Sequence, residues 1–381
     1  MRSTFWNRIE IEDDCPNFWG DDDYIEDQED IYYFYLHETI GFFLDRTDGG
    51  PFSFTFCMES GYREQNRYDG FMRLLQYSDQ WEEASIRLWP SGVRFLEGHF
   101  PLLKKLEIHI YTNEYSKMVV FDDAPLLTHV VLWDIPTWQF DWSSLTIVSF
   151  QDTEDYKHIL ATLQKTINLV ELTVNDAFGE DDDINGGTSI RLPHLQSLSV
   201  CGAKLLIVLE TPALRRLKIN FCEDDPESSL SEVGTTVSFL RRPEIKLDIL
   251  VVESVPAAGI KEILPFTPDI NNLSLVRIPN VANVFNWLAG TGEQESKSSC
   301  LNVVWGSSKH VGEGLVALHD TIARRSPLGD TMRSRSPKEV IIQRPGEGQN
   351  VAANLRLLCR ERGIRFMFAE EMSTLTWGIE L

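Results

Sequence analysis

The chain has 381 residues, of which 43% are hydrophobic and 24% are charged, and its formal net charge is −23. This length and composition are those of a folded protein that can bury a sizeable core. The strong negative charge argues against a general binder of nucleic acid or of anionic membranes, because phosphate groups would repel it. Acidic residues predominate in 1–60 and basic residues in 321–365. We expect solvated charged surface there, with attraction between the two ends or to different partners as the alternative.

The cysteines and the apolar runs bear on the cellular compartment. Six cysteines are scattered along the chain without a Cys-x-x-Cys pair, which is typical of reduced thiols in the cytosol or nucleus. The N-terminal stretch MRSTFWNRIEIEDD lacks the apolar core of a signal peptide. No run of about 18 apolar residues is present. We therefore expect a cytoplasmic or nuclear protein without a membrane span.

Residues 1–99 are predicted to form an N-terminal cap and the first copies of a repeat. They contain the acidic stretch DDDYIEDQED at 21–30, which we expect to be a loop, either ordered or a disordered insertion.

The clearest repeats lie in residues 100–280. In TPALRRLKIN, apolar side chains occupy Leu214, Leu217 and Ile219, which we number 0, +3 and +5. The same pattern recurs with a mean spacing of about 24 residues, within the range of leucine-rich repeats. The residues assigned to position 0 are Leu103, Leu127, Trp142, Leu169, Leu195, Leu214, Leu247 and Ile270.

The repeat predicts how the chain folds. The +3 and +5 side chains of a short strand point to one face, and no single copy can bury that face alone. A proline often stands two residues before position 0, where it fixes a turn ahead of the strand. Helical spacing is expected over 155–167, 228–242 and 256–264.

We therefore predict an α/β fold. Residues 1–381 would form a single irregular leucine-rich-repeat-like solenoid, with a curved, mainly parallel sheet and irregular helices on the outer side. The asparagine ladder of regular leucine-rich repeats, at +8, is missing, and the spacing varies. We therefore expect irregular curvature.

Residues 281–381 are predicted to hold the C-terminal repeats and a cap, formed by a helix over 350–363 and the strand IRFMF. A basic loop over 323–339 contains Ser-Pro steps at Ser326 and Ser336. The loop is either unmodified or phosphorylated, and phosphate would remove its local positive charge.

One acidic stretch partly matches a calcium-binding loop. In GEDDDINGGTSIRL, Asp181, Asp183, Asn185 and Gly186 match positions 1, 3, 5 and 6 of an EF-hand. Leu192 stands where the bidentate Glu is required. We expect a solvated loop rather than a calcium site.

Other candidate sites are weaker. The Gly-x-Gly stretches complete neither a dinucleotide fingerprint nor a phosphate loop. His109 and His129 alternate with the core positions and are expected to face solvent. Trp133, Trp138 and Trp142 form either part of the core or an exposed partner patch. The sequence thus predicts no catalytic, cofactor-binding or metal-binding residue, and leaves the partner-binding residues unknown.

The order of several segments resembles a known family. STFWNRIEI, with Trp6 and Ile9, is followed by HETIGFFLDRTDGGPFSFTF, by an acidic segment with Gln80 and Trp81, and by the repeats. SFLRRPEIKLDILVVESV adds a further match. This order is similar to the F-box and leucine-rich-repeat proteins of mushroom-forming fungi, of the basidiomycete type. The F-box would precede Trp6 and is missing from this chain.

The resemblance implies a non-catalytic module for protein–protein interaction, like the substrate-recognition part of an F-box adaptor in a cullin ubiquitin ligase. Its partner would be an unidentified protein, which could be a ubiquitylation substrate. Skp and cullin subunits are expected only with an F-box upstream, and neither nucleic acid nor membrane is expected as a partner. The alternative is an F-box-less regulatory or structural repeat protein without a ligase link. An enzyme is the least favoured hypothesis, because no catalytic motif is present.

Overall fold

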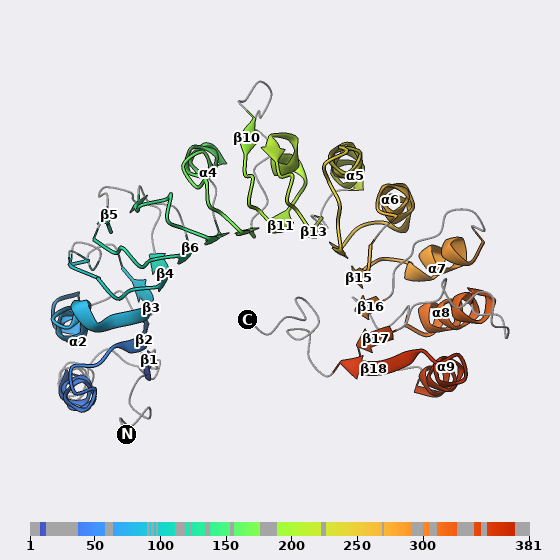
Figure 1. Ribbon diagram of the computed structural model, residues 1–381. Coiled ribbons are helices and arrows are strands. Elements are labelled where there is room, and N and C mark those ends of the chain that lie inside the picture. The colour runs from blue at the N-terminus through green and yellow to red at the C-terminus, as the bar shows by residue number, and fades with distance from the viewer. Residues whose placement is uncertain are drawn as a thin grey trace, which may run out of the picture. The chain divides into compact units, whose positions relative to one another are not determined.

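The computed structural model is built of parallel strands and helices in two compact units, Met1–Asn175 and Asp176–Leu381 (Figure 1). The described residues are 8–12, 37–57, 64–89, 92, 95, 96, 98–110, 119–121, 123–133, 138–152, 156–175, 189–221, 226–268, 270–290, 300–304, 311–325, 339–343 and 349–369.

In unit 1 the strands follow the order β1-β2-β3-β4-β6-β8-β9, and neighbouring strands pair in parallel. The strands are β1 (Arg8–Glu12), β2 (Phe52–Cys57), β3 (Trp81–Leu88), β4 (Lys105–Ile110), β6 (His129–Trp133), β8 (Ile147–Gln151) and β9 (Glu171–Val174). The helical segments between them include one described over 37–46, α2 (Glu64–Leu75), η2 (Ser78–Gln80) and α4 (Tyr156–Leu163). A separate parallel pair joins β5 (Val119–Val120) to β7 (Trp138–Gln139).

In unit 2 the order is β11-β13-β14-β15-β16-β17-β18, again with parallel pairs. The strands are β11 (Ser197–Cys201), β13 (Arg216–Asn220), β14 (Ile249–Glu253), β15 (Asn272–Val276), β16 (Cys300–Val304), β17 (Glu339–Gln343) and β18 (Arg365–Ala369). The helices are η3 (Lys204–Ile207), α5 (Pro226–Leu240), α6 (Ala257–Ile263), η4 (Leu264–Phe266), α7 (Val281–Gly290), α8 (Val311–Arg325) and α9 (Gln349–Glu361). A short pair joins β10 (Ile190–Arg191) to β12 (Leu209–Glu210).

The fold is therefore α/β with a large, mainly parallel sheet, as the sequence predicts. Helices α5 to α9 lie on one side of the strands of unit 2 (Figure 1). Helices α4, α5 and α6 lie within or close to the ranges expected from helical spacing, and α9 followed by β18 matches the expected C-terminal helix and strand. Among the described helices, none combines the length and the apolar character that a membrane span requires.

The core lies where the 0, +3 and +5 pattern places it. Leu214, Leu217 and Ile219 are at most 1% exposed, and the corresponding residues of the neighbouring copies are also buried. Register explains why they meet. Leu198 of β11 is opposite Leu217 of β13, which is opposite Leu250 of β14. Each +3 side chain therefore contacts the +3 side chain of the next strand, and the copies share one core.

One copy was assigned to the wrong register. The sequence places Trp142, Leu145 and Ile147 at 0, +3 and +5, but Ile147 is only half-buried and lies on the opposite face. Val148 and Phe150 are fully buried together with Leu145, which therefore occupies position 0. The error arose because Trp142 is also apolar and buried, and so imitates the start of the pattern three residues early.

Backbone hydrogen bonds confirm this corrected register. The carbonyl of Lys104, at +1, accepts the backbone N–H groups of Thr128 and His129, each at 3.1 Å. The carbonyl of Thr128 accepts those of Thr146 and Ile147 at 2.9 and 3.0 Å. Thr146 thus holds position +1, directly after Leu145.

A hydrogen-bonded turn precedes most strands. The backbone N–H of Leu103 donates to the carbonyl of Phe100 at 3.2 Å. The backbone N–H of Leu195 donates to the carbonyl of Leu192 at 3.3 Å. The prolines expected to fix this turn occupy its second position, where their fixed φ fits best. They are Pro101, Pro125, Pro193, Pro212 and Pro268.

A left-handed residue follows several strands at position +7. Asp152, Gly202, Ser254 and Arg277 have φ values of 53°, 73°, 60° and 50°. This conformation turns the chain away from the strand, and it is strained for Ser and Arg. This shared feature has no sequence signature, because only one of the four residues is a glycine.

The core of unit 1 contains a continuous chain of aromatic rings. The Trp81 ring packs edge-on against Phe54 and at a tilt against Phe100, with ring centroids 4.6 and 5.2 Å apart. Further rings continue the series at 5.1 to 5.3 Å, through Phe121, Phe140 and Trp142. Several of these rings lie before position 0, and together they fill the space between turns of successive copies. Ring pairs at such distances add to the stabilisation from apolar burial.

We expect Phe100→Ala to lower the free energy of unfolding by about 3–5 kcal/mol, because it leaves a cavity in this chain of rings. Urea unfolding followed by tryptophan fluorescence measures the change. Ile167→Ala, at a side chain that is 55% exposed, serves as the control and should change stability by about 0.5 kcal/mol or less. Similar losses for both variants would contradict the packing described here.

Two glycines of unit 2 should respond oppositely to alanine. Gly202 has a left-handed backbone, and an added Cβ would lie 2.9 Å from Oε1 of Glu232. Gly234 lies inside α5, with no atom within 4 Å of an added Cβ. Gly202→Ala should destabilise unit 2 by about 1 kcal/mol or more. Gly234→Ala should stabilise it by up to about 1 kcal/mol, because alanine favours helix.

Thermal unfolding of the two glycine variants against the parent chain gives the sign of each effect. Changes of the same sign in both would contradict the backbone conformation assigned to Gly202.

Candidate interaction face of the sheet

The side chains at +2, +4 and +6 lie on the sheet face opposite to the core, which we call the polar face of each unit. The pleat of the strands places them there, since alternate side chains point to opposite sides. In unit 2 the helices lie on the core side of the strands (Figure 1). The alternation of side chains along each strand therefore determines both the core and the polar face.

In unit 1 an imidazole and an indole stack on the polar face. His109 of β4 and Trp133 of β6 occupy neighbouring +6 positions, and their ring centroids are 5.2 Å apart. Both side chains are half-buried. A half-exposed tryptophan held in place by a neighbour is typical of the anchors that dominate protein interfaces. The sequence correctly predicted that His109 faces away from the core.

Burial changes the protonation of the two histidines. Burial lowers the pKa of His129 to about 4, and the positive charge of Lys105 on the next strand adds to the effect. Burial also lowers the pKa of His109, helped by Arg87 and opposed by Asp152 and Glu107. Both imidazoles are therefore neutral at physiological pH, and can stack or accept hydrogen bonds without carrying charge.

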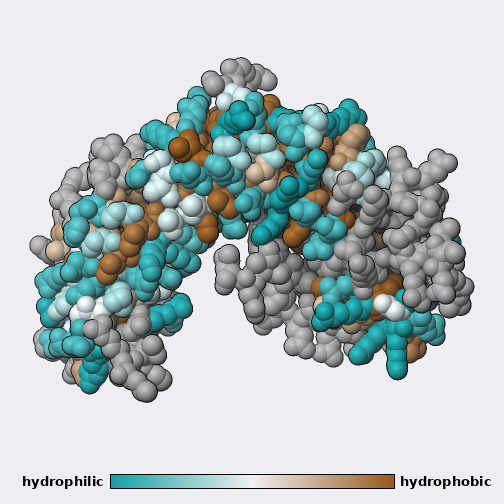
Figure 2. Space-filling view, viewed as in Figure 1, coloured by the Kyte–Doolittle hydropathy of each residue, from teal (hydrophilic) through white to brown (hydrophobic). Residues whose placement is uncertain are grey.

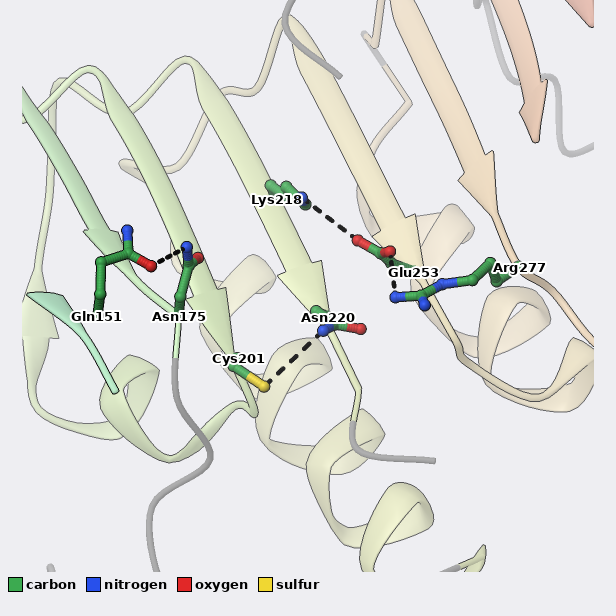
Figure 3. Close-up of polar contacts among 7 residues, drawn as sticks. All are labelled: Gln151, Asn175, Cys201, Lys218, Asn220, Glu253 and Arg277. Carbon is green, nitrogen blue, oxygen red and sulfur yellow. Dashed lines mark hydrogen bonds and ion pairs between the residues drawn. The ribbon is translucent and has the colours of Figure 1, made fainter. Parts of the chain in front are cut away.

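Polar side chains at the ends of the strands join neighbouring copies. Asn175 donates from Nδ2 to Oε1 of Gln151 at 2.6 Å, and Gln151 donates from Nε2 to Oγ of Ser149, also at 2.6 Å. In unit 2, Nδ2 of Asn220 lies 3.9 Å from Sγ of Cys201. Figure 3 shows the Gln151–Asn175 and Cys201–Asn220 contacts, which join +6 positions of neighbouring strands. At the same position β6 carries Trp133 and β15 carries Val276.

The strongest electrostatic feature of unit 2 is an ion triad on its polar face. Oε2 of Glu253 lies 3.3 Å from Nζ of Lys218, and Oε1 accepts a hydrogen bond from Nη2 of Arg277 at 2.5 Å (Figure 3). The Glu253 side chain is only 8% exposed. Removing this carboxylate from water costs several kcal/mol, which the two short charge-assisted contacts offset.

The ion triad can be predicted from the sequence only when the pairing register of β13, β14 and β15 is known. Lys218, Glu253 and Arg277 are separated by more than twenty residues at each step, and lie at +4, +6 and +7 of successive copies. Writing the copies in register would have placed the three charges together. Sequence motifs consist of residues close together in the chain, and three residues this far apart do not form one.

Exposed hydrophobic side chains are scattered. Figure 2 shows that hydrophobic residues reach the drawn face of the molecule in small areas among hydrophilic ones. The most exposed large ones include Ile167, Ile207 and Leu357. Extended apolar patches mark many binding sites. The polar faces carry charges, amides and an aromatic pair, together with aliphatic side chains such as Val251, Val276 and Ile249.

The structure places only some of the residues considered from sequence. Trp142 is 6% exposed and belongs to the core, while Trp133 is half-buried on the polar face. His194 is exposed at the start of its copy. Within the described residues, no group of three His, Cys, Asp or Glu side chains could hold a metal ion. The acidic loop at 21–30, the EF-hand-like residues Asp181 to Gly186, and Ser326 and Ser336 lie outside the described residues.

Cys359 is a free, buried thiol in the described part of the chain. Burial raises the pKa of the Cys359 thiol to about 12. It therefore stays protonated, and a protonated thiol is a poor nucleophile. The comparisons with known proteins add no assignment: neither the family models nor the curated proteins contain a match to this chain.

We expect His129 to make stability depend on pH between about 6.5 and about 4. Its folded-state pKa, about 4, lies below the ordinary value, so the unfolded chain binds more protons in this window. The stabilisation is therefore complete above pH 6.5 and is lost as the pH falls towards 4. Urea midpoints at pH 7.5 and pH 5 should differ less in His129→Gln than in the parent chain.

The exposed His194 provides the control for this measurement. His194→Gln should leave the difference between the two pH values as it is in the parent chain. Equal reductions in both variants would show that burial of His129 does not perturb its titration.

Proposed function

We propose that the chain is a non-catalytic protein-binding module, built as a leucine-rich-repeat-like solenoid whose polar faces bind a protein partner. The observation that carries this proposal is the division of the strands into two faces. One row of side chains forms a shared core. The other row lies opposite to the helices and carries charged, amide and aromatic side chains, some half-exposed and others, such as Glu253 and Ser199, buried. A surface made of many short parallel strands suits an extended partner, as in other repeat proteins.

The repeated local geometry supports the solenoid. The proline turn before the strand, the shared +1 carbonyl and the left-handed residue at +7 recur from copy to copy. Recurrent turns at the same place in each copy are what stacking of one structural unit requires.

The ligase link is proposed from the resemblance alone. If a form of the protein carries an F-box ahead of Trp6, the bound protein would be a ubiquitylation substrate, and Skp and cullin subunits would join the complex. Without an F-box, the same faces would serve a regulatory or structural role. An enzyme remains the least favoured proposal, since neither the sequence motifs nor the charged groups of the polar faces form a catalytic set.

Site-specific photo-crosslinking tests the proposal. A benzoylphenylalanine is placed at Thr173 or Asn272 on the polar faces, or at the exposed Ala161 or Ser231 on helices α4 and α5. In lysate of the source organism, the polar-face positions should crosslink to one protein, and excess unlabelled chain should compete with the crosslink. The helix positions should not. Crosslinks from the helix positions alone would overturn the proposal.

The identity of the captured proteins then distinguishes the ligase adaptor from the F-box-less regulatory or structural role. Skp or cullin subunits captured with an N-terminally extended form support the adaptor. Their absence, with the same crosslinked partner present, supports the F-box-less role.

A further inference from the structure

The polar face of unit 2 has an excess of positive charge. On β11, β13, β14 and β15, the charged side chains of this face are Arg216, Lys218 and Glu253, and Arg277, at +7 directly after β15, reaches Glu253 from the edge of the face. Three are cations and one is an anion. The whole chain has a net charge of −23. This face is therefore a local exception to the charge of the molecule.

Glu253 holds two of the cations in fixed positions. It contacts Lys218 on one neighbouring strand and Arg277 just beyond the other. The side chains of Lys218 and Arg277 are 20% and 41% exposed, whereas Glu253 is almost fully buried. The anion thus lies beneath the cations, and the cations reach the surface. Among the described residues, Glu253 is the one partner of the Arg277 guanidinium, which carries five N–H donors.

Apolar side chains lie beside the triad. Val251 and Val276 are buried on this face, and the half-buried Ile249 packs against them. An apolar surrounding lowers the local dielectric constant and strengthens contacts with charged groups nearby. The cations can therefore bind a carboxylate more strongly than isolated surface lysines and arginines do.

We propose that the polar face of unit 2 binds an extended acidic peptide segment of the protein partner, with Lys218 and Arg277 as its carboxylate-binding residues and Glu253 as the residue that positions them. This inference rests on the proposed function and names the chemistry of its partner. β13 and β15 are separated by one strand, so their cations lie on the order of 10 Å apart in the sheet. An extended peptide repeats its side chains on one face about every 7 Å, within reach of these long, flexible cations.

The net negative charge of the chain disfavours the binding of a nucleic acid to the polar face of unit 2. A polyanion would be repelled by the net charge of −23 at long range. A short peptide with few carboxylates experiences mainly the charges within a Debye length, about 8 Å at physiological salt. For such a peptide the nearby charges of this face, three cations and one anion, matter more than the charge of the whole chain.

Fluorescence anisotropy with synthetic probes tests the inference on the full chain. The probe is a fluorescein-labelled peptide of alternating Glu and Thr, compared with the same peptide carrying Gln in place of Glu. The Glu peptide should bind more tightly, and added salt should weaken its binding. Lys218→Gln combined with Arg277→Asn should weaken it by about tenfold or more. Asparagine is chosen because it tolerates the left-handed backbone of Arg277.

Lys246→Gln is the matched control. It removes one exposed positive charge just before β14, at the opposite end of the strands, and should leave binding unchanged. Equal weakening by Lys246→Gln would show diffuse attraction and overturn the inference. Failure of the Glu peptide to bind the parent chain, or tighter binding of a labelled single-stranded oligonucleotide, would overturn it as well.

Folding and function are checked separately. Circular dichroism shows whether the double variant is folded. If it is not folded, the difference in affinity between the Glu and Gln peptides for the parent chain tests whether carboxylates are bound. The crosslinks from Thr173 and Asn272 do not depend on these probes. If those crosslinks form but the Glu peptide does not bind, the acidic partner is wrong and the proposed function stands.

Discussion

The structure depends on the burial of one apolar row of side chains shared between neighbouring parallel strands. A strand of five residues, such as β13, buries Leu217 and Ile219 only because Leu198 and Leu250 lie beside Leu217 in register. Burying a side chain of this size is worth roughly 1.5–3 kcal/mol. No copy gains this alone, so each strand is stable only between its neighbours.

This constraint separates the roles of the two faces. The core face must keep apolar residues at 0, +3 and +5, whereas the polar face has no such requirement. Charged and aromatic residues are therefore tolerated at +2, +4 and +6, where they form the His109 and Trp133 stack in unit 1 and the ion triad in unit 2. Both features lie on strands whose positions the core has already fixed. The partner-binding groups proposed here are rigid for the same reason.

Local patterns allowed much of the fold to be predicted from the sequence. The period of the strands, the proline turns and the C-terminal helix were correct, because each depends on residues close together in the chain. The register of the copy that contains Trp142 was predicted wrongly, because a buried aromatic residue before the strand resembles the apolar residue at position 0. Leu230 fits the apolar spacing of its helix, but it is 54% exposed. The aromatic series through Trp81 and Phe100 could not be predicted, because its members occupy different positions in successive copies.

The site was far less predictable than the fold. Lys218, Glu253 and Arg277 come from three copies, and only their register brings them together. The sequence does show that no compact motif is present, and it placed His109 and His129 opposite to the core. It could not show that burial keeps His129 neutral, because this depends on what surrounds the ring.

The shared register of neighbouring strands is the central claim, and disulfide formation measures it directly. Ser85 of β3 is paired with Glu107 of β4, and both lie on the polar face. Cysteines at these two positions should form a disulfide in the folded chain, detected by peptide mapping without reduction, because paired residues are close enough for the bond. Cysteines at Ser85 and Ile108 point to opposite faces and should remain reduced. Absence of the first disulfide, or equal formation of both, would contradict the account.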